Sequence, residues 1–166
     1  MNLDAFNAAD SATASEALRR CCSCSRWIAQ LVHGRPYPNA EALRAAADRV
    51  WAELDEDDYL EAFAGHPQIG DIDSLREKYA DTRSLAAGEQ SGVSGADDET
   101  LQRLARGNQI YLERFGFIFI VCATGKSAGD MLELLEARLD NTRAQEIANA
   151  AEEQRKIFQI RLGQLL

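Results

Sequence analysis

The alternation of hydrophobic and polar positions along the chain predicts a helical protein. Apolar residues recur at helical spacing in five stretches. They are residues 13–32, 40–54, 97–115, 128–139 and the C-terminal stretch that begins at Thr142. The run "FIFIVCA" (117–123) is instead continuously apolar, which is typical of a buried strand or an extended segment. Because no comparable run could pair with it, we expect its backbone N–H and C=O groups to be available to a ligand.

Capping residues indicate where several of these helices begin. Asn39 and Ser127 are expected to cap the second and fourth stretches, because their side chains can accept from free N–H groups of the first turn. Thr142 and Gln145 have the spacing of a capping box at the start of the last helix. Gly116 is expected to end the helix that precedes the apolar run.

The middle of the chain is less regular. A short helix, "EDDYLEAFA", leads into the loop "AGHPQIGD" (64–71), and "DSLREKYA" is predicted to form two helical turns opened by Asp73. Residues 81–98 contain three glycines, and a long loop of this kind is usually functional or disordered. The chain as a whole is predicted to be all-α: a compact single-domain helical bundle over residues 1–166, with one extended apolar segment near 117–123.

Composition and charge narrow the classes of partner. The 166 residues are 46% hydrophobic, which is enough for a substantial core in one domain. The net charge is -9 and no basic stripe is present, so nucleic acid is excluded as a partner. No apolar run reaches membrane-spanning length. An anionic small molecule stays compatible with this charge, because a single arginine can bind a carboxylate.

The chain ends and the cysteines favour a cytoplasmic protein. The N-terminus lacks the cationic and apolar regions of a secretory signal, and "GQLL" is not a peroxisomal address. Cys21 and Cys24 form a C-x-x-C, but no second pair follows at the spacing of a zinc site. We interpret the cysteines as small residues on a helix face in a reducing compartment.

Three polar residues lie where packing alone does not account for them. His66 stands between Gly65 and a proline that favours an extended backbone, although a histidine at a helix end also suits the helix dipole. Asn108 is on the apolar stripe of its helix, where it either bonds to nearby backbone or faces a polar ligand. Arg161 falls on the apolar face of the last helix, either reaching to solvent or directed at an anion.

In combination, these features resemble the 2-oxo-4-hydroxy-4-carboxy-5-ureidoimidazoline (OHCU) decarboxylases, which carry out the last step from urate to allantoin. The resemblance rests on "HPQIG" from His66, "GEQSGV" from Gly88, Asn108 followed by "YLERFGFIFIVCATGKS", and "RL" at 161–162. It covers nearly the whole chain. It implies a helical bundle without cofactor or metal that acts on OHCU as a carboxy-lyase and releases (S)-allantoin. It leaves open whether the protein is a homodimer.

The resemblance also implies roles for particular residues. His66 would be the catalytic general acid and Glu89 its essential carboxylate partner. The substrate-binding residues that it implies are Pro67, Ala86, Ala87, Gly88, Glu89, Gln90, Asn108, Phe119, Ile120, Val121, Cys122, Ala123 and Arg161. Many members have a serine where this chain has Ala86, which puts one side-chain hydrogen bond to the substrate in question.

The chemistry of the reaction accounts for these residue types. Loss of carbon dioxide leaves an electron pair that the adjacent C=N of the substrate can accept, so no cofactor is needed as an electron sink. The remaining task is stereospecific proton delivery to a planar intermediate, which suits a histidine of near-neutral pKa. Glu89, in contact with His66, would favour the imidazolium.

Two other functions compete with the decarboxylase interpretation. One rival is a helical interaction module with His66 as a cap. The other is a metal-dependent lyase using His33, His66 and carboxylates, which lacks H-x-x-x-H spacing.

Overall fold

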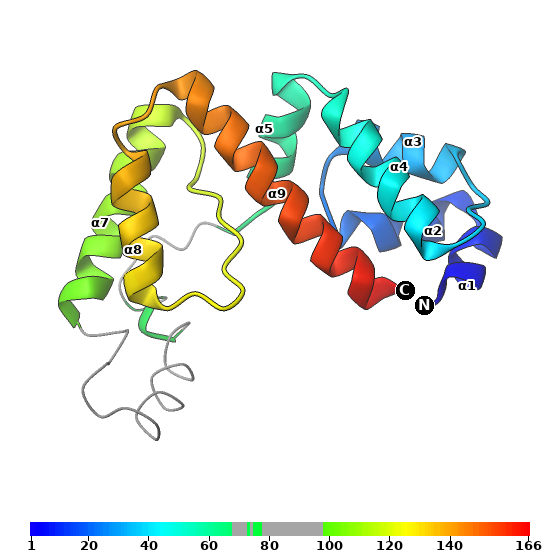
Figure 1. Cartoon of the computed structure of the whole chain (residues 1–166), viewed down its shortest axis with the longest axis horizontal. Helices are drawn as coiled ribbons and strands as arrows, with labels where there is room; N and C mark the ends of the chain where they lie inside the picture. The colour runs from blue at the N-terminus through cyan, green and yellow to red at the C-terminus, as the bar shows by residue number, and fades with distance from the viewer. Residues whose placement is uncertain (68–72, 74, 78–97) are drawn as a thin grey trace. The chain divides into compact units, whose positions relative to one another are not determined.

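The computed structural model describes residues 1–67, 73, 75–77 and 98–166, and the secondary structure of these residues is helical (Figure 1). The helices are α1 (Leu3–Ala8), α2 (Ser11–Arg19), α3 (Ser25–His33), α4 (Ala40–Ala52), α5 (Glu56–Ala64), α7 (Asp98–Phe115), α8 (Ala128–Arg138) and α9 (Arg143–Leu165). The all-α prediction is confirmed. None of the described helices is long and apolar enough to cross a bilayer.

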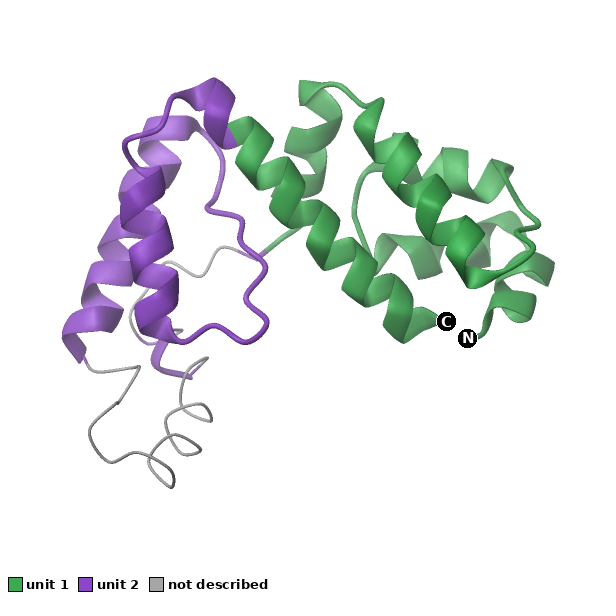
Figure 2. Ribbon diagram, in the orientation of Figure 1, with its two compact units in different colours: residues 1–66, 147–166 green, residues 67–146 purple. Residues whose placement is uncertain are grey.

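The chain divides into two compact units (Figure 2). Unit 1 consists of residues 1–66 and 147–166, and unit 2 of residues 67–146. Unit 1 therefore contains α1 to α5 and most of α9, while unit 2 contains α7, α8 and the first residues of α9. The prediction of one domain over the whole chain stays a prediction.

Two buried tryptophans organise the core of unit 1. Trp27 of α3 packs on Phe158 of α9 with ring centroids 4.9 Å apart, and its indole N–H donates to the Ala47 carbonyl at 3.1 Å. Trp51 of α4 donates its indole N–H to the Ala151 carbonyl of α9 at 3.0 Å. Because each indole N–H finds a partner inside the protein, these large rings are buried without loss of a hydrogen bond. The three helices thus share one core.

The stretch 13–32, predicted as one helix, is two helices in the structure. The chain leaves the α-helix after α2, and the buried Cys24 stands at the start of α3 without a side-chain capping bond. Glu61 of α5 performs the capping instead, since it accepts from the backbone N–H of Ser25 at 2.8 Å and from its hydroxyl at 2.7 Å. The hydrophobic periodicity of residues 13–32 could not reveal this cap, because Glu61 lies 36 residues after Ser25 in the sequence. Helix α1 was not predicted either.

The other predicted helix starts are confirmed. Asn39 accepts from the N–H of Ala42 at 2.8 Å, and Ser127 forms a capping box with Asp130. Thr142 and Gln145 bond reciprocally, as their spacing predicts. In "DSLREKYA", Asp73 and residues 75–77 are helical, whereas the predicted loop at 81–98 lies outside the described residues except for Asp98, which begins α7.

The predicted extended segment is confirmed as a stretch without regular structure between α7 and α8. Gly116, with a φ of 82°, turns the chain out of α7, a conformation that favours glycine. Residues 118–123 then follow without helix or strand. Ile120 is buried, while Phe119 and Val121 on either side of it are half-buried. The buried side chain fixes the segment to the core, and its two neighbours are partly accessible.

A buried ion pair in unit 2 fixes the course of this segment. Glu146 is fully buried and accepts from the Arg138 Nε at 2.7 Å, from the Tyr111 hydroxyl at 2.6 Å and from the Asn141 amide at 2.8 Å. Arg138 in turn donates from Nη1 to the Ile120 carbonyl at 2.8 Å. Burial raises the pKa of Tyr111, so its hydroxyl stays protonated and serves as a donor to the carboxylate.

We expect Glu146→Gln to lower the free energy of unfolding by about 3 kcal/mol, because it leaves the guanidinium of Arg138 buried without its counter-charge. Urea denaturation followed by circular dichroism measures the change. Glu136→Gln is the matched control, since Glu136 pairs with Arg103 at 2.6 Å with both side chains about half exposed. We expect that control to change the free energy by less than about 1 kcal/mol. Equal losses in the two variants would contradict the structural role of the buried pair.

Candidate functional site

His66 is held at the end of α5 by local backbone bonds. Gly65 ends the helix with its N–H directed at the carbonyls of Ala62 and Phe63, and the His66 N–H donates to the Phe63 carbonyl at 3.2 Å. Gly65 also tolerates unusual dihedral angles, but its φ is -74°, so the glycine is not needed for its conformation. It is needed for space, because a Cβ there would lie 2.6 Å from the Cβ of Ser23. His66 therefore sits in a turn packed closely against the chain before α3.

The imidazole of His66 contacts a buried amide of α9. Its Nε2 lies 2.5 Å from Oε1 of Gln154, whose side chain is fully buried. The Nε2 of Gln154 has no hydrogen-bond partner among the described residues. An unpaired buried donor of this kind costs about 1–3 kcal/mol. Among the described residues, His66 is therefore the one polar partner of the Gln154 side chain, whose burial is energetically unfavourable.

The described surroundings of His66 favour the neutral imidazole. Burial of the half-buried ring lowers the pKa of His66 below its usual value of about 6.5. The hydrogen bond with Gln154 acts in the opposite direction, and the positive charge of Arg161 lowers the pKa further. A negative charge close to the ring would reverse this balance. Glu89, the carboxylate expected there, lies outside the described residues.

Arg161 is exposed in the structure. It precedes the buried Leu162, and its Nη1 donates to the Cys21 carbonyl at 3.4 Å, which is a long bond. Its position beside the apolar face of α9 therefore does not bury the guanidinium. Its positive charge nevertheless acts on the His66 imidazole and lowers the pKa of that ring. Its predicted role in binding substrate stays a prediction.

In unit 2, two carbonyls of the extended segment are occupied by side chains. The carbonyl of Ile120 accepts from Arg138, and that of Cys122 accepts from the Lys126 ammonium at 2.7 Å. The prediction that the backbone acceptors of this run are available is therefore wrong at these two positions, because neighbouring side chains reach them. The N–H groups of Phe119, Ile120 and Val121 have no hydrogen-bond partner among the described residues. Three successive donors of this kind suit a ligand with carbonyl or carboxylate oxygens.

The remaining predicted residues are placed in part. The Asn108 amide nitrogen donates to the Leu104 carbonyl of its own helix at 2.9 Å, which is the structural alternative weighed from the sequence. Pro67 is exposed, and Ala123 is half-buried after the extended segment. Ala86, Ala87, Gly88, Glu89 and Gln90 lie outside the described residues. Among the residues that are described, no group of three His, Cys, Asp or Glu side chains is arranged to hold a metal ion.

Sequence reasoning missed Gln154 and misjudged Arg138. Gln154 follows the buried Ala151 by three positions and precedes the buried Phe158 by four, so a polar residue on the apolar stripe was a usable signal. From its charge alone, Arg138 is predicted to lie on the surface, but its side chain is 11% exposed and paired with buried Glu146. Nothing in the local pattern distinguishes such an arginine from a solvated one, because its partner lies on another helix.

Comparisons with known proteins agree on one family. A family model described as OHCU decarboxylase matches residues 7–163. A 2-oxo-4-hydroxy-4-carboxy-5-ureidoimidazoline decarboxylase of Haloferax volcanii is 26% identical over 165 residues, covering 99% of this chain and 95% of the relative. The uric acid degradation bifunctional protein TTL of Arabidopsis thaliana is 34% identical over 145 residues, covering 87% of this chain, which spans 45% of that relative.

The fold of this chain is also similar to that of a solved structure. The crystal structure of OHCU decarboxylase in the presence of (S)-allantoin superposes with a TM-score of 0.74 at 32% sequence identity. The match covers 91% of this chain and 96% of the solved one. Since a family model, two relatives and a solved fold coincide over most of its length, the chain belongs to the OHCU decarboxylase family.

Proposed function

We propose that this protein decarboxylates OHCU to (S)-allantoin in urate degradation, as a carbon–carbon lyase. The observation that carries the proposal is the family match over residues 7–163. The solved OHCU decarboxylase, with its 32% identity and its (S)-allantoin, supports the choice of product. A cytoplasmic location and a homodimeric state stay predictions.

The reaction itself needs no external electron sink. Cleavage of the bond to the carboxylate releases carbon dioxide, and the electron pair of that bond moves into the adjacent C=N of the substrate. The resulting intermediate is planar at the carbon that must become stereogenic. The enzyme's task is then to hold this intermediate and to deliver one proton to one face, which is positioning combined with general acid catalysis.

His66 is the proton donor in this proposal. Its position at the end of α5 is fixed by backbone bonds and by Gln154, so the ring presents one edge in a constant direction. The described surroundings lower the pKa of His66, and a low pKa makes the imidazolium a stronger acid once it is formed. Glu89 is the group proposed to supply the negative charge that forms the imidazolium when substrate is bound.

Substrate binding is assigned to two sets of groups. The free N–H donors of Phe119, Ile120 and Val121 match the carbonyl oxygens of the ureido group and ring. Arg161 is proposed to bind a charged or polar edge, because its exposed guanidinium provides a planar set of donors. The further contacts proposed from the family resemblance are those of Pro67, Ala86, Ala87, Gly88, Gln90, Asn108, Cys122 and Ala123.

The stereochemistry of the product tests the function. The substrate is unstable and decays spontaneously to racemic allantoin, so it is generated enzymatically from urate and the optical activity of the product is followed. We expect the protein to give an excess of (S)-allantoin and His66→Ala to give the racemate, because the variant has no proton donor at the intermediate. His66→Ala should stay folded but melt somewhat below the wild type, because the buried Oε1 of Gln154 loses its partner. Racemic product with the wild-type protein would refute the proposed activity and favour an interaction module.

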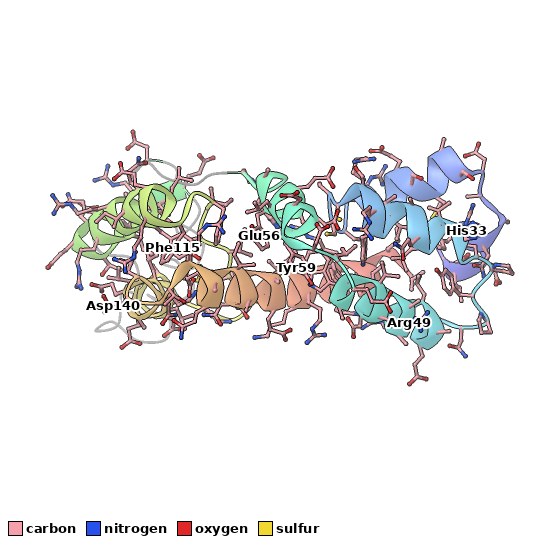
Figure 3. The ribbon with its side chains drawn as sticks, turned by 90° about the horizontal axis from the view of Figure 1, so that it is seen from above. His33, Arg49, Glu56, Tyr59, Phe115 and Asp140 are labelled. Atoms are coloured by element: carbon pink, nitrogen blue, oxygen red, sulfur yellow. The ribbon has the colours of Figure 1, made fainter. Side chains whose placement is uncertain are left out.

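Arg161 provides a second test, through binding. Arg161→Lys keeps the positive charge but loses the planar fork, so we expect it to raise KM about as much as Arg161→Ala does, by about tenfold or more. Steady-state measurements on freshly generated substrate give KM and kcat separately. Arg49 of α4, exposed and labelled in Figure 3, supplies the control Arg49→Ala. If both Arg161 variants match that control, the guanidinium is solvated and has no part in binding.

A further inference from the structure

Gln154 differs from the other buried polar side chains of the described residues. Asp58 pairs with Arg26 at 2.7 Å and caps α5, and Glu146 has three donors around it. Within the described part of the chain, Gln154 has one polar contact, with Nε2 of His66, and its own amide nitrogen has no partner. An apolar side chain of similar size would fill the same space without that unpaired donor. A buried amide whose polar contact is the ring of the proposed proton donor is suited to orienting that ring.

The contact distinguishes the two nitrogens of the His66 ring. An amide oxygen has no proton to give, so with Oε1 facing the ring the proton between them belongs to Nε2 of His66. Nδ1 of His66 has no hydrogen-bond partner among the described residues. The neutral ring held in this way carries its proton on Nε2 and has a free lone pair on Nδ1. Gln154 is fully buried on the same face of α9 as the buried Ala151 and Phe158.

We propose that Gln154 is a positioning residue that holds His66 as the Nε2–H tautomer and makes Nδ1 the nitrogen that exchanges a proton with the substrate. The proposal rests on the proposed decarboxylase function and adds to it the identity of the reacting nitrogen. In the protonation step, the Nδ1–H bond of the imidazolium breaks and a C–H bond forms with the electron pair that loss of carbon dioxide released. The N–H electrons stay on the ring, which returns to the neutral Nε2–H form still bonded to Gln154.

The charged groups around His66 define what a change at Gln154 does to its titration. Arg161 of α9 disfavours the imidazolium, and the Cys21 thiol before α3 is neutral near pH 7 because burial raises its pKa to about 11. Gln154 itself is uncharged, so it orients the ring without fixing the proton on it permanently. A carboxylate in its place would stabilise the imidazolium and raise the pKa of His66. An apolar side chain would remove a hydrogen bond that favours the protonated ring and would lower that pKa.

The test compares Gln154→Leu and Gln154→Glu with the wild type in kcat, KM, enantiomeric excess, pH profile and melting temperature. We expect Gln154→Leu to lower kcat by about 10²-fold with little change in KM, since the proton donor is present but free to rotate or change tautomer. Its melting temperature should equal or exceed that of the wild type. Gln154→Glu should retain a good part of the activity, with the pKa that governs kcat moved to higher pH. Gln159→Leu, on the same helix and with its amide bonded to Asp48 at 2.8 Å, is the control.

Each result supports or overturns the proposal. A Gln154→Leu variant with wild-type kcat and pH profile would show that the reaction does not use the contact. Variants that unfold, or that melt well below the Gln159→Leu control, would make Gln154 a structural residue and also overturn it. If the wild-type protein gives racemic allantoin, the proposed function fails instead, and that outcome is recognised before any variant is measured.

Discussion

The hydrogen bond between His66 and Gln154 is the contact on which the rest of the proposed site depends. It joins the turn after α5 to the middle of α9, although the two residues are 88 positions apart in the chain. α9 can present Gln154 there because Trp51 of α4 donates its indole N–H to the Ala151 carbonyl of α9, while Trp27 of α3 joins α3 to α4 through the Ala47 carbonyl. The core of unit 1 thus fixes the orientation of a single imidazole ring. Loss of that orientation would leave a histidine without a defined reacting edge.

Unit 2 holds the proposed ligand-binding backbone in place with charged side chains. Its extended segment has no strand partner among the described residues, so its carbonyls would be costly to bury. Arg138, held by the buried carboxylate of Glu146, satisfies the Ile120 carbonyl, and Lys126 satisfies that of Cys122. The N–H groups of Phe119, Ile120 and Val121 have no partner within the described part of the chain. Backbone donors of this kind suit a ligand rich in carbonyl oxygens.

The fold was predictable from sequence where the signal is local. Asn39, Ser127 and the Thr142–Gln145 pair cap their helices as their spacing predicts, and residues 118–123 of the apolar run lie outside helix and strand. What sequence could not give depends on contacts made by folding. Ser25 begins a helix because Glu61 caps it from α5. The importance of Gln154 is visible only from its contact with His66, which is distant in the sequence. The family resemblance named His66 and Glu89, but nothing in the residue pattern specified which ring nitrogen reacts.

The nitrogen-15 NMR spectrum of the His66 imidazole tests this account most directly. It is recorded on the intact protein at a pH above the titration of the ring, with His66→Ala used to distinguish its signals from those of His33. We expect a protonated, pyrrole-like Nε2 and an unprotonated, pyridine-like Nδ1, because the Gln154 oxygen accepts from Nε2. A ring with its proton on Nδ1, or an equal mixture of the two tautomers, would contradict it.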